Sequence, residues 1–204
     1  MAQKEKKEEY FELKILTLGD TSVGKSSFIV KFIENTFSYD YLATMGLDFK
    51  QKEIKLKSGE KILLRIFDTA GQERFKSISL NFIKKANGIV LLYDISKRES
   101  FESVNKWIKS INDVAEEKIS IVLVGNKCDL EEDRKVTKEE GKKKAEEFQI
   151  PFYESSCKDG INIYEVFERL SEEILKKGKI KASNRGEKIT KEKAKTTKKS
   201  GGCC

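Results

Sequence analysis

An eight-residue stretch near the amino terminus, "GDTSVGKS" (residues 19–26), constrains the fold of this chain more than any other feature. It fits the pattern G-x-x-x-x-G-K-[ST], whose glycines let the backbone curl so that successive N–H groups point at phosphate oxygens. In such a loop Lys25 reaches the β- and γ-phosphates, and the Ser26 hydroxyl binds Mg²⁺. An apolar segment (residues 13–19) precedes the loop and an amphipathic one (residues 25–34) follows it. We therefore predict a strand, a phosphate-binding loop and a helix whose positive dipole end faces the phosphates.

The rest of the chain alternates between strand and helix patterns. Period-two alternation, or short apolar runs, predict further strands at residues 45–56, 61–67, 88–95, 119–127 and 151–154. Helical periodicity predicts helices at residues 101–115, 137–148 and 161–176. This order predicts an α/β fold of the doubly wound P-loop NTPase type, with a mostly parallel six-stranded sheet and one antiparallel edge strand. Ligands bind beyond the carboxyl ends of the strands in such sheets, so the loops there are the candidate sites.

The loop after the apolar run 119–125 reads "GNKCD" and predicts guanine recognition. The Asp129 carboxylate can accept two hydrogen bonds from the N1–H and exocyclic amine of guanine, and adenine offers no such pair. Asn126 can contact the N7/O6 edge of the base, and the Lys127 stem can lie along its plane. A site built for these donors discriminates strongly, because adenine would leave Asp129 unpaired.

The segment "DTAGQE" (residues 68–73) follows another predicted strand and carries the groups needed for hydrolysis. Asp68 stands where a carboxylate would hold Mg²⁺, and the Gly71 amide can approach the γ-phosphate. Gln72 is placed to orient an attacking water, and since it is neutral it acts by positioning. The chain contains no histidine, which excludes Ser-His-Asp and Cys-His catalysis.

These motifs together resemble the Ras-like small GTPases, and within them the Rab branch, over residues 10–177. The segments "MGLDF" and "DTAGQERF" and the terminal double cysteine carry the Rab likeness. The resemblance implies that Thr44 binds Mg²⁺ beside Ser26 and Asp68, and that Ser156, Cys157 and Lys158 of "ESSCK" match a base-contacting loop. The residues expected to bind nucleotide are Gly19, Thr21, Ser22, Val23, Gly24, Lys25, Ser26, Ser27, Thr44, Gly71, Asn126, Lys127, Asp129, Ser156, Cys157 and Lys158.

Two single residues and one segment depart from the family pattern. Cys157 replaces the usual alanine of the base-contacting loop, where the contact is mainly from backbone N–H groups. Phe67 stands where a tryptophan is common, and "FIKKA" (residues 82–86) replaces "YYRGA". The effector-facing aromatic cluster of the family would here be Phe49, Phe67 and Phe82. These changes bear on which partners are chosen and leave the nucleotide chemistry intact.

The periodic patterns end at Lys177, where a segment rich in Lys, Thr, Ser and Gly begins and predicts disorder. Charge is concentrated in this carboxyl-terminal part. Residues 176–204 hold eleven Lys/Arg and two acids, which leaves 30 basic and 32 acidic residues in the body. The chain ends in "GGCC", and the resemblance implies geranylgeranylation of Cys203 and Cys204. Two lipid chains and a basic tail would hold the protein on an anionic membrane. The charged amino terminus does not read as a secretory signal.

We accordingly expect a flexible amino terminus (residues 1–10), a small GTPase domain (residues 11–177) and a basic tail with the prenylation site (residues 178–204). The resemblance implies a Rab-type GTP/GDP switch in vesicle trafficking that hydrolyses GTP slowly, with an activating protein supplying an arginine. It further implies an exchange factor, effectors and prenylation and membrane-extraction machinery, on a monomer shared between the cytoplasmic face of a membrane and a cytosolic pool. No nucleic acid is expected.

Two other interpretations stay open on the residues alone. A phosphate-loop ATPase would show no GTP preference to lose when Asp129 is replaced. A nucleic-acid-binding module led by the tail would bind with steep salt dependence through residues 176–204. The near-neutral body and the guanine loop favour the GTPase over both.

Overall fold

The computed structural model describes residues 9–37, 47–69, 82–115, 119–178 and 180–184. Its strands are β1 (Glu9–Leu18), β2 (Leu47–Lys55), β3 (Lys61–Thr69), β4 (Gly88–Asp94), β5 (Ser120–Asn126), β6 (Phe152–Ser155) and β7 (Ser183–Asn184). Its helices are α1 (Lys25–Glu34), α3 (Arg98–Val114), α4 (Lys138–Phe148) and α5 (Ile163–Lys176), with a short 3-10 turn, η2 (Glu131–Asp133).

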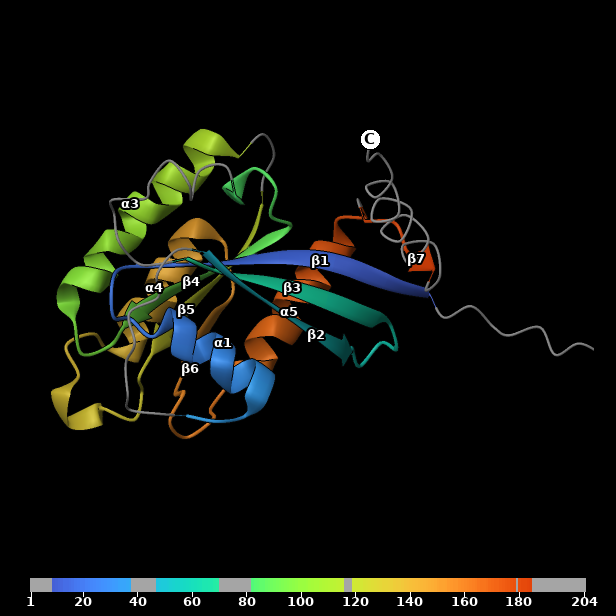
Figure 1. Ribbon diagram of the computed structural model, residues 1–204. Helices are drawn as coiled ribbons and strands as arrows, with labels where there is room; N and C mark the ends of the chain where they lie inside the picture. Colours follow the sequence, from blue (N-terminus) through green and yellow to red (C-terminus); the bar gives the residue numbers. More distant parts are fainter. Residues whose placement is uncertain (1–8, 38–46, 70–81, 116–118, 179, 185–204) are drawn as a thin grey trace, which may run out of the picture.

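Six strands form the sheet in the order β2-β3-β1-β4-β5-β6 (Figure 1). All neighbours pair in parallel except β2 and β3, which form an antiparallel hairpin with β2 at the edge. This confirms the predicted doubly wound sheet with one antiparallel edge strand. The fold follows from the alternation of strands and helices, since each parallel connection must cross over a face of the sheet.

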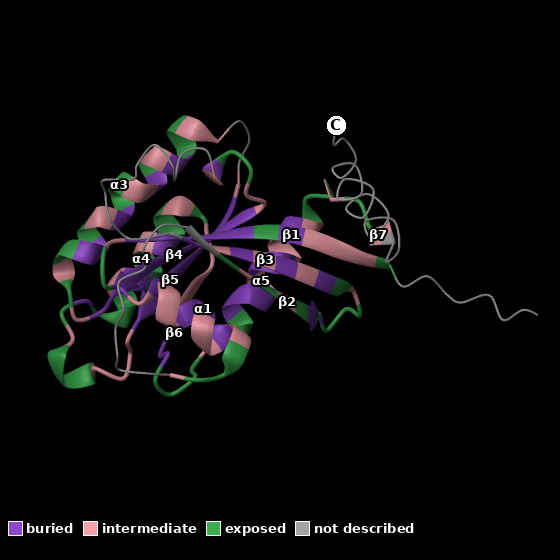
Figure 2. Cartoon of the chain, in the orientation of Figure 1, coloured by how far each residue is buried: buried purple, intermediate pink, exposed green. Residues whose placement is uncertain are grey.

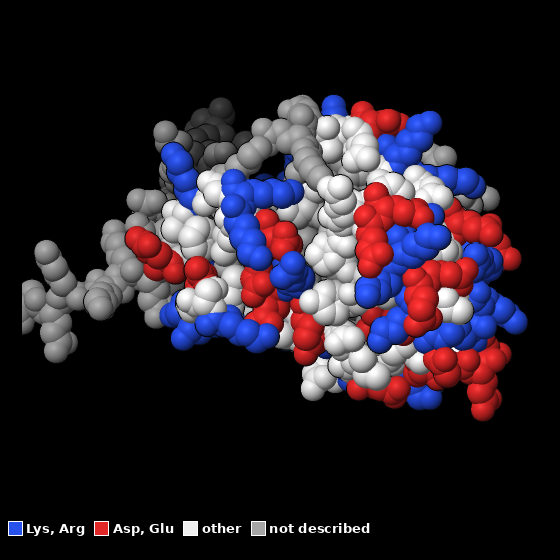
Figure 3. All heavy atoms as spheres, turned by 180° about the vertical axis from the view of Figure 1, so that it is seen from behind, with Lys and Arg blue, Asp and Glu red and all other residues white. Residues whose placement is uncertain are grey.

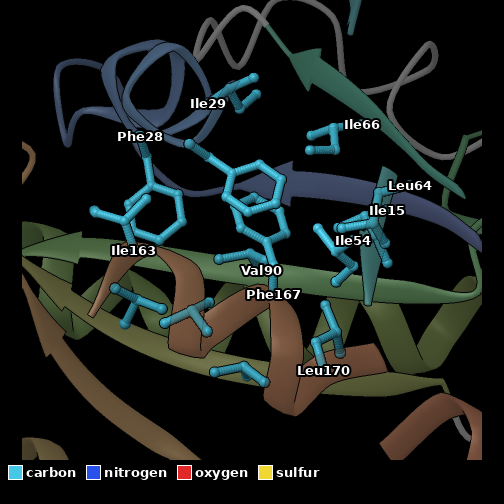
Figure 4. Packing of buried hydrophobic residues seen from close by; sticks show 14 of the residues in the cluster. Ile15, Phe28, Ile29, Ile54, Leu64, Ile66, Val90, Ile163, Phe167 and Leu170 are labelled. Atoms are coloured by element: carbon cyan, nitrogen blue, oxygen red, sulfur yellow. The ribbon is translucent and has the colours of Figure 1, made fainter. Parts of the chain in front are cut away.

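Each face of the sheet carries its own hydrophobic core. Helices α1 and α5 cover one face, where the rings of Phe28 and Phe167 lie 5.6 Å apart between their centroids (Figure 4). Helices α3 and α4 cover the other face, where Tyr93 packs edge-on against Phe101. Strands β4 and β5 are buried along their whole length (Figure 2), as their continuous apolar runs predict for strands covered on both sides.

The register of the parallel strands brings three carboxyl ends to one edge. Asp94 at the end of β4 pairs with Asn126 at the end of β5, and Asn126 in turn pairs with Ser155 at the end of β6. The loops that follow these strands therefore start side by side, next to the loop that follows β1. This edge is where the sequence places the nucleotide site.

Two elements begin before their apolar patterns do. Strand β1 starts at Glu9, because Phe11 packs against the core and the Glu12 carboxylate forms an ion pair with Arg65 on β3. Helix α3 starts at Arg98, three residues before the apolar pattern at Phe101. Its first turn is polar and is tied to the end of β4, where the Ser100 hydroxyl accepts from the backbone N–H of Asp94.

The carboxyl-terminal segment also differs from expectation. The sequence predicts no regular structure after Lys177, yet β7 pairs antiparallel with the start of β1, Ser183 with Tyr10 and Asn184 with Glu9. Ile180 packs against the α1–α5 core, and this apolar contact explains why the chain turns back onto the sheet. The prediction of irregular structure was therefore wrong at β7.

Acidic and basic side chains are interspersed over the face of the molecule drawn in Figure 3. This agrees with the near balance of charge outside the carboxyl-terminal segment. Within the described ranges, none of the helices is long and apolar enough to cross a membrane.

Candidate functional site

The loop between β1 and α1 requires glycine at two positions. Gly19 has φ of 139°, and a Cβ there would lie 2.2 Å from the Leu92 carbonyl oxygen. Gly24 has φ of 99°, and its Cβ would lie 2.4 Å from Asn126 Nδ2. Both conformations favour glycine, and both neighbours are held by the sheet. The two glycines of the phosphate-loop pattern therefore let this loop lie close against β4 and the guanine loop.

Lys25 is buried and its ammonium group lies over the loop. Its Nζ donates to the carbonyl oxygens of Gly19 at 3.0 Å and Asp20 at 2.7 Å. Burial lowers the pKa of Lys25 to about 8, against an opposing effect of the Asp68 and Asp20 carboxylates. The Lys25 ammonium group thus donates to uncharged carbonyl oxygens, and it lies next to backbone that a phosphate can approach.

Two of the three predicted magnesium ligands are described. Ser26 is half-buried in the first turn of α1, and Asp68 is buried near the end of β3. Asp68 lies near enough to Lys25 for its charge to raise the pKa of that lysine. A hydroxyl and a carboxylate are hard oxygen donors, so this donor set suits Mg²⁺. The described part of the chain contains no cluster of three or more His, Cys, Asp or Glu side chains that could hold a metal without other ligands.

Asn126 joins three loops. Its side-chain Nδ2 donates to the Val23 carbonyl in the phosphate loop at 2.8 Å, and its Oδ1 accepts from Ser155 Oγ at 3.0 Å. The Cys157 thiol also donates to Oδ1, at 3.6 Å. Asn126 is buried, so these bonds are made away from water. The side-chain amide of Asn126 therefore fastens the predicted guanine loop to the phosphate loop.

Lys127 is held in place by a residue that the motif analysis did not select. Its Nζ lies 2.7 Å from Oδ2 of the fully buried Asp94, and it donates to the Ser22 carbonyl at 2.9 Å. The other carboxylate oxygen of Asp94 accepts from the backbone N–H and the hydroxyl of Ser96. This arrangement leaves the lysine stem stretched across the edge of the site.

Asp129 is held by the loop that follows β6. The Ser156 hydroxyl donates to Asp129 Oδ1 at 2.7 Å and accepts from the Asp159 backbone N–H at 3.0 Å. Cys157 beside it is buried, and burial raises the pKa of its thiol to about 12. Lys158 is exposed. The structure thus brings the two predicted base-contacting loops together, with a carboxylate fixed between them.

The remaining predicted residues divide into those described and those that are not. Thr21 and Ser22 are exposed in the phosphate loop, Val23 is buried below it, and Ser27 is half-buried in α1. Five of the predicted residues lie outside the described residues: Thr44, Gly71, Gln72, Cys203 and Cys204.

The three aromatic residues predicted to face effectors form one cluster. The Phe49 ring lies 5.4 Å from that of Phe67, which lies 5.6 Å from that of Phe82. Phe49 is 43% exposed, while the other two are half-buried. The cluster therefore has one accessible ring, that of Phe49, packed beside the half-buried rings of Phe67 and Phe82.

Asp94 and Ser155 are the site residues that motif reading missed. Both stand at carboxyl ends of strands, Asp94 directly after the apolar run of β4 and Ser155 just before the predicted base-contacting residues. The rule that ligand sites gather at these ends could have selected them. Their partners could not be read from the sequence, because the bonds depend on register across the sheet.

Comparisons with known proteins place the chain in a family. The model of the Ras family matches residues 14–176. The Ras-related protein Rab-10 of Diplobatis ommata is 43% identical over 172 residues, which cover 84% of this chain and 86% of that protein. The Ras-related protein Rab-13 of Rattus norvegicus is 43% identical over 164 residues, or 80% of each chain. The GTP-binding protein ypt2 of Schizosaccharomyces pombe is 42% identical over 172 residues, or 84% of this chain and 85% of that protein. The match extends over the phosphate loop, the guanine loop and the sheet that joins them, and the chain therefore belongs to the Ras family as a Rab-type small GTPase.

Proposed function

We propose that this GTPase is a switch that alternates between GDP and GTP and recruits effectors to a membrane during vesicle trafficking. The observation that carries the proposal is the pair of hydrogen bonds that joins the Asn126 side chain to the phosphate loop and to Ser155 at the end of β6. A site joined in this way would bind the base and the phosphates together. A change in the bound phosphates could then alter the conformation of the connected loops.

The nucleotide would lie along the edge formed by the strand ends. Asp129 would accept from guanine, with Ser156, Cys157 and Lys158 along the base, while Lys25 and the loop amides would bind the phosphates. Ser26, Thr44 and Asp68 would hold Mg²⁺, which neutralises phosphate charge when bound. That Ras-family proteins bind GTP and GDP together with Mg²⁺ supports this assignment.

Hydrolysis would depend on Gln72, which would orient the attacking water while the Gly71 amide approaches the γ-phosphate. The intrinsic rate of such proteins is slow, on the order of 10⁻⁴–10⁻² s⁻¹, and an activating protein would supply the arginine that stabilises the transition state.

Single-turnover hydrolysis tests the role of Gln72. We expect Gln72→Leu to retain GTP and lower the rate, since leucine has no hydrogen bond to offer water. Gln51→Leu, on the exposed side of β2, is the matched control. Equal rates in all three proteins would remove Gln72 from the mechanism.

The switch itself can be tested without a partner. Thr44 and Gly71 would contact the γ-phosphate, so hydrogen exchange should slow in residues 36–49 and 68–82 when a non-hydrolysable GTP analogue replaces GDP. Strand β4 should not change. An effector that reads Phe49, Phe67 and Phe82 would then bind the GTP state more tightly, and this difference in affinity would drive recruitment. Identical exchange in both states would mean that the chain binds nucleotide without switching.

Attachment to the membrane would use Cys203 and Cys204. Two geranylgeranyl chains, with the basic residues before them, would hold the tail on an anionic cytoplasmic surface, and extraction machinery would return the protein to a cytosolic pool. Residues 178–204 would form this tail, residues 11–177 the GTPase domain of a monomer and residues 1–10 a flexible start. Fractionation of a Cys203→Ser/Cys204→Ser variant should show loss from membranes, whereas Cys128→Ser should not. Persistence of the double variant on membranes would contradict lipid anchoring.

A further inference from the structure

The only tryptophan of the chain is bonded to the phosphate loop. Trp107 lies in the middle of α3, and its indole Nε1–H donates to Oδ1 of Asp20 at 2.8 Å. Both residues are partly buried, and the rest of the indole packs against the core between α3 and the sheet. The bond therefore connects a helix on one face of the sheet with the loop that would receive the phosphates.

Asp20 is held through both its side chain and its backbone. Its carboxylate accepts from Trp107, while its backbone carbonyl accepts from Lys25 Nζ at 2.7 Å. The same carboxylate is close enough to Lys25 to influence its charge. A loose Asp20 could turn its negative charge toward the phosphate site and draw the Lys25 ammonium away from it. The indole N–H, which can only donate, keeps the carboxylate turned to α3.

We propose that Trp107 is a positioning residue for nucleotide binding, which acts by holding the Asp20 carboxylate against α3 and so fixing the backbone on which Lys25 rests. This inference depends on the proposed phosphate site. The rate of nucleotide dissociation should therefore depend on the hydrogen bond between Trp107 on α3 and Asp20 in the phosphate loop.

A series of full-length variants separates the bond from packing and from charge. Trp107→Phe retains an aromatic ring and removes the donor, Asp20→Ala removes the acceptor, and Asp20→Asn keeps an acceptor oxygen without the charge. We expect the first two to release fluorescent GDP about tenfold faster, which is near the lower end of the effect of a hydrogen bond to a charged group. Asp20→Asn should stay within about threefold of wild type, since an amide oxygen still accepts the bond. The Trp107→Phe/Asp20→Ala double variant should be no faster than either single one, because both changes remove the same bond.

Ile108→Val is the control for stability, because it trims a buried apolar side chain of the same helix that takes no part in the hydrogen bond. It should lower the melting temperature and leave GDP release unchanged. The single indole N–H resonance gives a direct readout: it should shift in Asp20→Ala and be largely retained in Asp20→Asn.

Three results would overturn the inference. Wild-type release rates in Trp107→Phe would show that the bond is irrelevant, and multiplicative effects in the double variant would show that the two residues act separately. Equally fast release in Asp20→Asn and Asp20→Ala would assign the effect to charge. If the wild-type chain itself bound no guanine nucleotide, the proposed function would fail instead, so the two failures are distinguishable.

Discussion

The base side and the phosphate side of the site are built differently. On the base side, side chains bind one another: Asn126 with Ser155, and Asp129 with Ser156. On the phosphate side, the side chain of Lys25 binds the carbonyl oxygens of its own loop. The base side is thus assembled before any ligand arrives. On the phosphate side, a Lys25 that binds phosphate as proposed would exchange these carbonyl oxygens for phosphate oxygens, so the ligand would complete the structure.

This difference separates recognition from response. A preassembled carboxylate can discriminate guanine at little cost in ordering, because its hydrogen-bond partners already fix its position. A lysine that changes partners makes the loop sensitive to whether phosphate is present and in what charge state. Asn126 connects the two sides, and it is the first place to test the comparison.

The largest expected effect comes from Asn126→Ala. This change deletes the bond to Val23 and leaves the Ser155 hydroxyl and the Val23 carbonyl without their buried partner. We expect GDP affinity to fall by about a hundredfold or more, since several buried bonds are lost together. Equilibrium titration with fluorescent GDP measures it, with Asn105→Ala, whose amide makes an exposed bond to Lys144, as the control. A loss below fivefold would mean that the two sides are assembled independently.

A smaller effect should follow from Asp94→Asn. The amide preserves an oxygen for the Ser96 bonds but removes the negative charge that holds Lys127. We expect GDP to dissociate about tenfold faster, because the lysine would lose the charge that positions it. The exposed Asp113→Asn on α3 is the matched control. Unchanged dissociation kinetics would show that Lys127 is positioned by Ser22 alone.

The phosphate side should be sensitive to pH. Burial lowers the pKa of Lys25 to about 8 in the protein without nucleotide, and phosphate oxygens would favour the charged form and raise it. Above that pH the complex holds a proton that the unbound protein has lost, so affinity for GDP should be constant below pH 7 and fall several-fold as pH rises through 8 to 9.5. Calorimetric titration over this range measures the affinity and the proton uptake. In Lys25→Arg the guanidinium stays charged, so the same pH dependence there would assign the titration to another group.

The smallest effect is expected at Cys157, where the chain departs from its family. The thiol is a weak donor to Asn126 Oδ1 at 3.6 Å, and Ser155 Oγ donates to the same oxygen at 3.0 Å. Cys157→Ala should therefore alter GDP dissociation by no more than about twofold, and Ser155→Ala should alter it more. The reverse order in stopped-flow measurements would show that the sulfur has the stronger role.

The fold was predictable because its signals are local. The phosphate-loop pattern lies between a strand and a helix, and α1 begins and ends where periodicity predicts it. The apolar runs of β4 and β5 likewise predicted strands covered on both faces. What escaped prediction depends on distant partners: the start of β1 is defined by Arg65 and Phe11, and β7 has two residues and no pattern of its own.

The grouping of the candidate site residues at one edge of the sheet was predictable for the same reason. Lys25, Asn126 and Asp129 stand in local motifs, and each motif lies at the end of a strand. Asp94, Ser155 and Trp107 belong to no motif, since each acts on another side chain across the sheet or from a helix. Residues predicted to bind the ligand can be recognised from a sequence motif. Residues that position them can be recognised mainly from the contacts in the folded structure.

The pairing of β7 with β1 has a practical consequence for anyone who labels or fuses this protein. Glu9 and Asn184 are partners in that ladder, so the two ends of the described chain leave the domain at one corner, away from the loops at the carboxyl ends of the strands (Figure 1). A fluorescent protein or affinity tag joined at the amino terminus would be tethered beside the segment that leads to Cys203 and Cys204, where it could crowd an enzyme or a bilayer. The exposed turn around Gly59 lies at this same end of the sheet, because Phe11 on β1 pairs with Ile62 at the start of β3. A reporter inserted there would therefore stay away from the nucleotide edge but would also crowd this corner.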